Sequence, residues 1–86
     1  MELRYHKNFQ KQVLRLPPAQ QKRLQAALEV FVIDPYQSDL YNHPLSGKWK
    51  GYRSIGFGGD WRIHYKLLDQ GTALFVAVGT HNQLYG

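Results

Sequence analysis

Three strand-like segments separated by two tight turn signals constrain the fold of this chain more than any other feature. Residues 52–57 end at Gly58-Gly59, residues 61–68 end at Asp69-Gln70-Gly71, and residues 73–80 form the most apolar segment of the three. Glycine-containing turns of this length join neighbouring strands that run in opposite directions. The sequence therefore predicts an antiparallel sheet in the C-terminal half of the chain.

A first helix is predicted upstream of these strands. One face of it carries apolar residues at the spacing i, i+4 and i+7, and Asn8 precedes them as a candidate N-cap. Pro17-Pro18 ends this helix, because proline has no amide hydrogen and restricts the residue before it. The apolar positions are Phe9, Val13 and Leu16.

A second helix is predicted from Pro18, since proline is tolerated in the first turn of a helix. Asp34-Pro35 ends it, and a short alternation at Leu3–Tyr5 is consistent with an edge strand. This order of elements predicts an α+β fold of two layers, with the N-terminal strand and helical hairpin on one face of a small antiparallel sheet. The apolar stripe of the second helix is Leu24, Ala27, Leu28 and Phe31.

The alternation along residues 61–68 assigns their side chains to the two faces of the sheet. The set suited to contact with the helices is Trp61, Ile63, Tyr65 and Leu67. The opposite set would project from an open face as a basic surface and includes Arg62, His64 and Lys66. With 86 residues, the chain has room for one domain over residues 1–86.

The positive charge of the chain is concentrated in one segment. The formal net charge is +5, and residues 43–66 hold five basic residues against one acidic residue, a net charge of +4. This segment fits either an anionic partner or a plain solvated face. Cysteine is absent and no histidine or carboxylate pair has metal-ligand spacing, so neither a metal nor another cofactor is expected. Without a signal peptide or membrane span, a cytoplasmic location is expected.

The remaining polar residues permit RNA cleavage without a metal. In that reaction the ribose 2′-hydroxyl attacks the neighbouring phosphate, so one group takes a proton and another gives a proton to the leaving oxygen. Histidine can do either, cations stabilise the phosphate, and aromatic rings can stack on unpaired bases. Composition permits this chemistry without selecting it.

Three motifs carry a resemblance to a known family. They are the run His43-Pro44-Leu45-Ser46-Gly47-Lys48-Trp49-Lys50-Gly51-Tyr52-Arg53, the run from Gly59 to Leu67, and the ending Val78-Gly79-Thr80-His81-Asn82-Gln83-Leu84-Tyr85-Gly86. Together they resemble the RelE/ParE superfamily of bacterial type II toxins, and most closely its YafQ branch of mRNA interferases. The resemblance covers residues 43–86, about half of the chain.

The resemblance implies a RelE-like fold and a ribosome-dependent endoribonuclease that is neutralised by a cognate antitoxin in a hetero-oligomer. Carried over residue by residue, it implies a catalytic set of His43, Asp60, Arg62, His81 and Tyr85. It also implies RNA or phosphate binding by Lys48, Lys50, Arg53 and Trp61. One departure is visible, since the YafQ pattern has a further histidine where this chain has Gly56.

Several of these residues have a second interpretation that the sequence leaves open. The second interpretation makes Asp60 a turn former, Trp61 a core residue, and Tyr85 a tether of the C-terminus. His64 is interpreted as a bystander on the basic face and not as a catalyst. The whole chain also fits a ParE-like gyrase inhibitor, a toxin relic that only binds antitoxin, or a basic RNA-binding domain without catalysis.

Overall fold

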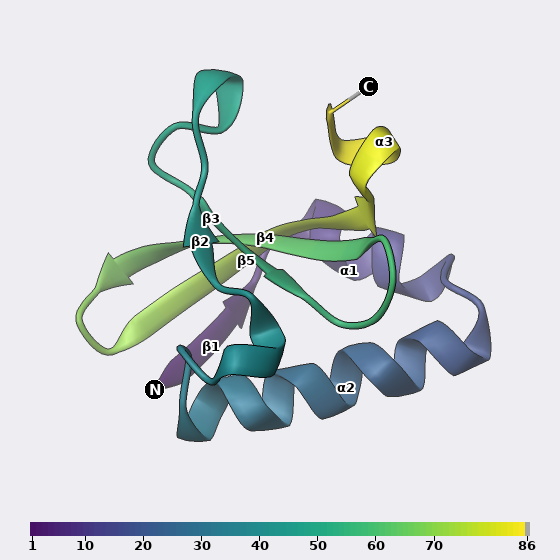
Figure 1. Ribbon diagram of the computed structural model, residues 1–86, viewed down its shortest axis with the longest axis horizontal. Helices are drawn as coiled ribbons and strands as arrows, with labels where there is room; N and C mark the ends of the chain where they lie inside the picture. Colours follow the sequence, from purple (N-terminus) through teal and green to yellow (C-terminus); the bar gives the residue numbers. More distant parts are fainter. Residues whose placement is uncertain (86) are drawn as a thin grey trace.

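The three predicted strands form the centre of the sheet, and both turn signals join antiparallel neighbours as expected. The computed structural model describes residues 1–85, and Gly86, the last residue of the C-terminal motif, lies outside the described part. Within residues 1–85 the sheet has five strands in the order β1-β5-β4-β3-β2 (Figure 1). In chain order the elements are β1 (Glu2–Tyr5), α1 (Lys7–Leu14), α2 (Pro18–Ile33), the 3₁₀ turn η1 (Ser38–Leu40), β2 (His43–Pro44), the 3₁₀ turn η2 (Gly47–Trp49), β3 (Arg53–Gly56), β4 (Trp61–Asp69), β5 (Thr72–Thr80) and α3 (His81–Tyr85).

The N-terminal strand makes the sheet mixed, which corrects the expectation of a purely antiparallel sheet. β1 lies at the edge beside β5 and runs parallel to it, with Leu3 opposite Ala73 and Tyr5 opposite Phe75. Turn signals specify only strands that follow one another in the chain, whereas β1 and β5 are separated by the rest of the molecule. The edge position predicted for the first strand is confirmed.

Both predicted helices are present, and one cap differs from the expectation. His6 and not Asn8 is the N-cap of α1, because the His6 Nδ1 accepts the backbone N–H of Asn8 at 3.0 Å. α2 begins at Pro18 and ends before Asp34, as the prolines predicted. No helix within the described residues is long and apolar enough to cross a membrane.

The core lies between α2 and one face of the sheet, as predicted for an α+β fold of two layers (Figure 1). Phe31 of α2 is fully buried and contacts two aromatic rings of the sheet. Its ring centroid lies 5.0 Å from that of Tyr65 and 5.3 Å from that of Phe75. Ile63 and Tyr65 therefore face the helices, in agreement with the alternation along β4.

A β-bulge in β5 reverses the alternation of that strand. His64 pairs with Ala77 and Tyr65 pairs with Phe75, so Val76 has no direct partner. An extra residue of this kind bends the strand and changes the side on which the following side chains lie. As a result, Phe75 and Val78 both join the core, although they are three residues apart.

The second face of the sheet is covered, contrary to the expectation that it is open. η2 and α3 both project from the side opposite α2 (Figure 1). Trp49 of η2 and Tyr85 of α3 lie over His64, with ring centroids 4.4 Å and 5.3 Å from the imidazole. The exposed fraction of His64 is 0%, so it is not a residue of the solvated face.

Candidate active site

A row of polar residues crosses the sheet beneath Trp49. His43 of β2 pairs with Ser54 of β3, and Ser54 pairs with His64 of β4. Directly paired residues of antiparallel strands point to the same face, and adjacent strands are about 5 Å apart, which places His43 and His64 roughly 10 Å apart at the backbone. The sheet register thus brings together two histidines that are 21 positions apart in the sequence.

The imidazole of His43 is oriented by the backbone just before it. Its Nδ1 lies 2.8 Å from the carbonyl oxygen of Tyr41. A carbonyl oxygen can only accept, so Nδ1 carries the proton and Nε2 of the neutral ring offers a lone pair. Tyr41 has a left-handed backbone, with a φ of 51°, which is uncommon for a residue other than glycine. His43 itself is exposed, so its free nitrogen is accessible to a substrate.

His64 lies at the floor of this region and is held neutral. Loss of water around the ring, and then the positive charges near it, lower the pKa of His64 to about 4. Those charges belong to the protonated form of His43, to Arg62 and to the protonated form of His81. His43, His64 and His81 are therefore close enough to interact, and we refer to these three residues as the histidine cluster.

The C-terminal helix supplies the third member of the cluster. His81 is the first residue of α3 and packs against Tyr85 in a tilted arrangement, with 4.6 Å between the ring centroids and an interplanar angle of 36°. Thr80 and Gln83 stabilise the start of the helix, because each accepts the other's backbone N–H through its side-chain oxygen. Burial raises the pKa of the Tyr85 hydroxyl, and Arg62 nearby opposes this effect.

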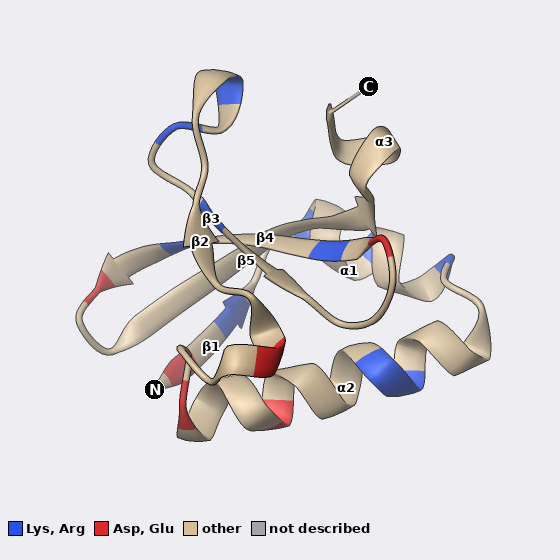
Figure 2. Ribbon diagram, viewed as in Figure 1, with Lys and Arg blue, Asp and Glu red and all other residues tan. Residues whose placement is uncertain are grey.

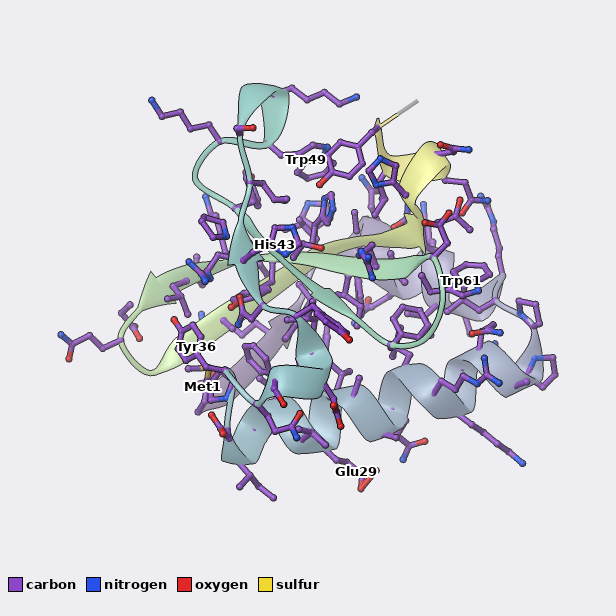
Figure 3. All side chains as sticks on the ribbon, in the orientation of Figure 1. Met1, Glu29, Tyr36, His43, Trp49 and Trp61 are labelled. Carbon is purple, nitrogen blue, oxygen red and sulfur yellow. The ribbon has the colours of Figure 1, made fainter. Side chains whose placement is uncertain are left out.

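Trp49 joins η2 to α3. Its indole Nε1 donates to the carbonyl oxygen of Leu84 at 3.3 Å, and its ring packs edge-on against His64. Figure 3 shows Trp49 between the two projecting segments, above the strand that carries His43. The residue thus holds the two sides of the candidate site together.

Arg62 lies on the same face as His64 because the two residues are two positions apart on β4, and both cross-strand neighbours of Arg62 are glycines. It pairs with Gly56 on β3 and with Gly79 on β5. A Cβ atom at Gly56 would lie 2.5 Å from Nη1 of Arg62, and one at Gly79 would lie 2.8 Å from Oε1 of Gln83. The missing side chains therefore leave room for the guanidinium over β3 and for α3 over β5.

Three further predicted residues lie on exposed segments around the cluster. Lys48 and Lys50 flank Trp49 on the η2 side, and Figure 2 shows basic residues on this projecting segment and on β4. Asp60 is in the turn before β4, where its carbonyl oxygen accepts the backbone N–H of His81 at 3.1 Å. This bond joins the turn that carries Asp60 to the beginning of α3.

Two predicted binding residues lie elsewhere. Arg53 pairs with Tyr65, on the face that carries the helices, where its Nε donates to Oδ1 of Asn42 at 2.8 Å and its guanidinium lies over the Tyr36 ring. Trp61 packs against the hydrophobic core and lies apart from Trp49 in Figure 3, in agreement with its interpretation as a core residue. The structure therefore brings neither residue to the histidine cluster.

Comparison with known proteins shows which family this chain belongs to. The family model described as "Bacterial toxin of type II toxin-antitoxin system, YafQ" matches residues 1–86. The chain belongs to the YafQ toxin family. The resemblance found in the three sequence motifs is thus confirmed.

Individual members of the YafQ family show how far the similarity extends. The mRNA interferase toxin YafQ of Escherichia coli strain K12 is 47% identical over 52 residues, which are 60% of this chain and 55% of that protein. The match thus spans little more than half the length of this relative. The crystal structure of YafQ from Escherichia coli strain BL21(DE3) has a TM-score of 0.79 at 28% identity and covers 99% of this chain and 98% of that one. The toxin in a structure of the Escherichia coli DinJ–YafQ complex has a TM-score of 0.75 at 29% identity, with the same two coverages.

The departure from the YafQ pattern at Gly56 has a structural counterpart. A side chain at position 56 and the guanidinium of Arg62 would occupy the same space, since a Cβ atom there already lies 2.5 Å from Nη1. In this member of the family, a cation from β4 thus fills the position beside β3 where the pattern has a histidine.

Sequence reasoning missed three residues of this region, namely Trp49, Ser54 and His64. Alternation along β4 placed His64 on the face of Arg62, which is correct, but it gave no sign that the residue is buried. The available signal for Ser54 was its place in β3 directly opposite His64, and this place depends on the register of the hairpin. Trp49 lies within the first family motif, and nothing in the sequence indicated that its ring covers His64.

A hollow of about 640 Å³ lies away from the cluster, between α2 and the connection from β3 to β4. Its lining is largely apolar and includes Ala27, Val30, Ile33, Leu40 and Phe57. It contains no histidine, so it lacks the groups needed for proton transfer near neutral pH. The candidate active site is therefore the exposed region around the histidine cluster.

Proposed function

We propose that this protein is the toxin of a type II toxin-antitoxin system and that it cleaves mRNA while the mRNA is being translated. The observation that carries the proposal is the convergence of the histidine cluster and Arg62 on one face of the sheet in a member of the YafQ family. The curated relative from Escherichia coli is named as an mRNA interferase, which supports the same activity.

His43 is the group suited to take the first proton. Its Nδ1 faces the carbonyl oxygen of Tyr41, so Nε2 of the neutral ring can accept the proton of the ribose 2′-hydroxyl. The 2′-oxygen then forms a bond to the phosphorus atom. The exposed position of His43 allows this contact without a rearrangement of the sheet.

His81 is placed to complete the reaction from the other side. Its protonated ring gives a proton to the 5′-oxygen as the bond from phosphorus to that oxygen breaks, which leaves a 2′,3′-cyclic phosphate and a 5′-hydroxyl. Arg62 stabilises the negative charge on the phosphate, and Lys48 and Lys50 hold the neighbouring backbone. Asp60 orients the start of α3 through the turn it occupies, and the Tyr85 ring packs against His81.

The shape of the site suggests why a ribosome is needed. His43, Asp60 and His81 are exposed, together with both lysines of the η2 segment, so these groups lie on the surface of the described residues and not inside a cavity. Holding the reacting atoms in line accounts for a large part of catalysis, and a surface site cannot supply this alone. We infer that the decoding site of the ribosome presents the mRNA, which places the protein in the cytoplasm.

A cognate antitoxin completes the proposal. Related toxins have been crystallised with their antitoxins, as in the DinJ–YafQ complex of Escherichia coli. The net charge of +5 favours an acidic partner segment, and a hetero-oligomer of toxin and antitoxin is expected.

The test compares two histidine variants in a translating extract with a reporter mRNA. Wild-type protein should cut the translated mRNA and leave an untranslated copy intact, and His81→Asn should lower the rate roughly 10² to 10⁴-fold. His6→Asn is the matched control, because His6 is exposed and asparagine also serves as an N-cap for α1. Full cleavage by His81→Asn contradicts the assignment of His81, and arrested DNA replication with intact mRNA contradicts RNA cleavage as a whole.

A further inference from the structure

Three buried polar atoms lie together beneath Trp49 without a hydrogen-bond partner in the described part of the chain. They are Nδ1 and Nε2 of His64 and the hydroxyl oxygen of Ser54. The exposed fractions of the two residues are 0% and 1%, and the two are directly paired across β3 and β4. Buried polar groups are nearly always satisfied in folded proteins, so a cluster of three calls for an explanation.

Packing alone does not explain a histidine at this position. A leucine has a similar size and would fill the space between Trp49 and Tyr85 without leaving unpaired nitrogens. A buried donor or acceptor that makes no hydrogen bond destabilises the folded state, whereas an apolar side chain of the same shape carries no such cost. The stability of the fold would therefore favour leucine over His64.

The cover over His64 is attached weakly on one side. Tyr85 is 36% exposed and belongs to a helix of five residues, in which Leu84 is the buried residue. The carbonyl oxygen of Leu84 accepts one bond from Trp49, at the long distance of 3.3 Å. Rotation of the Tyr85 ring, or movement of α3 as a whole, would open the side of the imidazole that faces α3, while Trp49 stays over the other side and the sheet remains intact.

We propose that His64 and Ser54 form a hydrogen-bonding seat for one base of a bound single-stranded RNA, which reaches them by displacing the Tyr85 ring. The proposal rests on the function proposed above. A neutral imidazole has one donor and one acceptor, and a hydroxyl has both, which matches the mixed edge of a base. The low pKa of His64 keeps the ring neutral, so it suits a base better than a phosphate.

The seat lies in the same row as His43, so a base held there is next to the group that takes the 2′-proton. A base at this place would lie between Trp49 and His81, which can both stack on it. His64 would then determine which nucleotide is accepted at the cleavage position.

The first arm of the test is cleavage mapping in a translating extract. His64→Leu should fold normally, lower the cleavage rate about tenfold or more, and broaden the nucleotide preference at the cut. His64→Gln, which keeps a donor and an acceptor, should cut faster than His64→Leu and shift the preference. Thr72→Val is the matched control, since Thr72 is another buried polar residue and lies at the far end of β5. An unchanged nucleotide preference in a folded His64→Leu protein contradicts the proposal that His64 binds the base.

The second arm does not depend on cleavage. The ring nitrogens of histidine are labelled with ¹⁵N in the His81→Asn variant, which is titrated with a short single-stranded RNA of mixed sequence. The His64 signals should shift by more than those of His6, which is remote from the site. His64 signals that stay fixed at saturating RNA overturn the proposal. If they shift while wild-type protein leaves translated mRNA intact, the seat stands and RNA cleavage is contradicted.

Discussion

The burial of His64 predicts a distinctive dependence of stability on pH. Its pKa is about 4 in the folded protein and returns to the ordinary value of 6.5 when the chain unfolds. Between these two values the unfolded chain binds one proton more than the folded chain, so acid favours unfolding. The stabilising contribution is complete above pH 6.5 and is lost as the pH falls towards 4.

The magnitude follows from the two pKa values. Each pH unit in this window changes the free energy of unfolding by about 1.4 kcal/mol, and the loss from pH 7 to pH 5 amounts to about 2 kcal/mol. For a domain of 86 residues this corresponds to a fall in Tm of roughly 10 °C. His64→Leu removes this contribution, and at pH 7 it should be at least as stable as the wild type because it also removes two unpartnered nitrogens.

The assay is chemical denaturation of the wild type, His64→Leu and the control His6→Asn at several pH values between 5 and 7. The charged and titratable groups facing His64 are His43, Arg62, His81 and Tyr85, and all four remain in His64→Leu. Their own contributions therefore cancel in the difference between the two proteins. Parallel stability curves for the wild type and His64→Leu would refute the reasoning, since the burial of His64 would then have no effect on proton binding.

Two other substitutions test the packing around the site. Gly56→Ala places a methyl group 2.5 Å from Nη1 of Arg62, so the guanidinium should move and mRNA cleavage should fall about tenfold or more. Thermal unfolding should be unchanged or slightly raised because Gly56 has an ordinary strand backbone, and full cleavage activity would contradict the placement of Arg62. Asn42→Ala leaves the hydroxyl of the buried Tyr65 and the Nε of Arg53 without their partner, at an expected loss of about 1 to 3 kcal/mol in urea unfolding. A loss of unfolding free energy well below this range would contradict the role given to Asn42.

Local chemistry explains which parts of the fold were predictable. The glycines at 58 and 59 adopt positive φ values of 126° and 55°, as a tight turn between β3 and β4 requires, and the prolines bound α2 as expected. The parallel pairing of β1 with β5 was not predictable, because no local signal connects two segments separated by the whole chain. The bulge at Val76 was equally hidden, since an alternation read from the sequence assumes an unbroken ladder.

The candidate site also has residues that the sequence predicted and residues that it did not. The motifs supplied His43, Arg62 and His81, which the sheet register and the start of α3 bring to one face. The burial of His64 depends on Trp49 and Tyr85, which approach from opposite sides through a 3₁₀ turn and a terminal helix. Sequence patterns within single segments cannot predict such a contact, because the contact forms only when segments distant in the sequence meet in the fold.

The pairing of Gly56 with Arg62 has a consequence for how sites of this kind can change during evolution. A side chain at position 56 and a guanidinium at position 62 exclude each other, so the effect of a mutation at one position depends on the residue at the other. The residue at position 56 therefore determines where the guanidinium at position 62 can lie, so the two positions are expected to depend on each other.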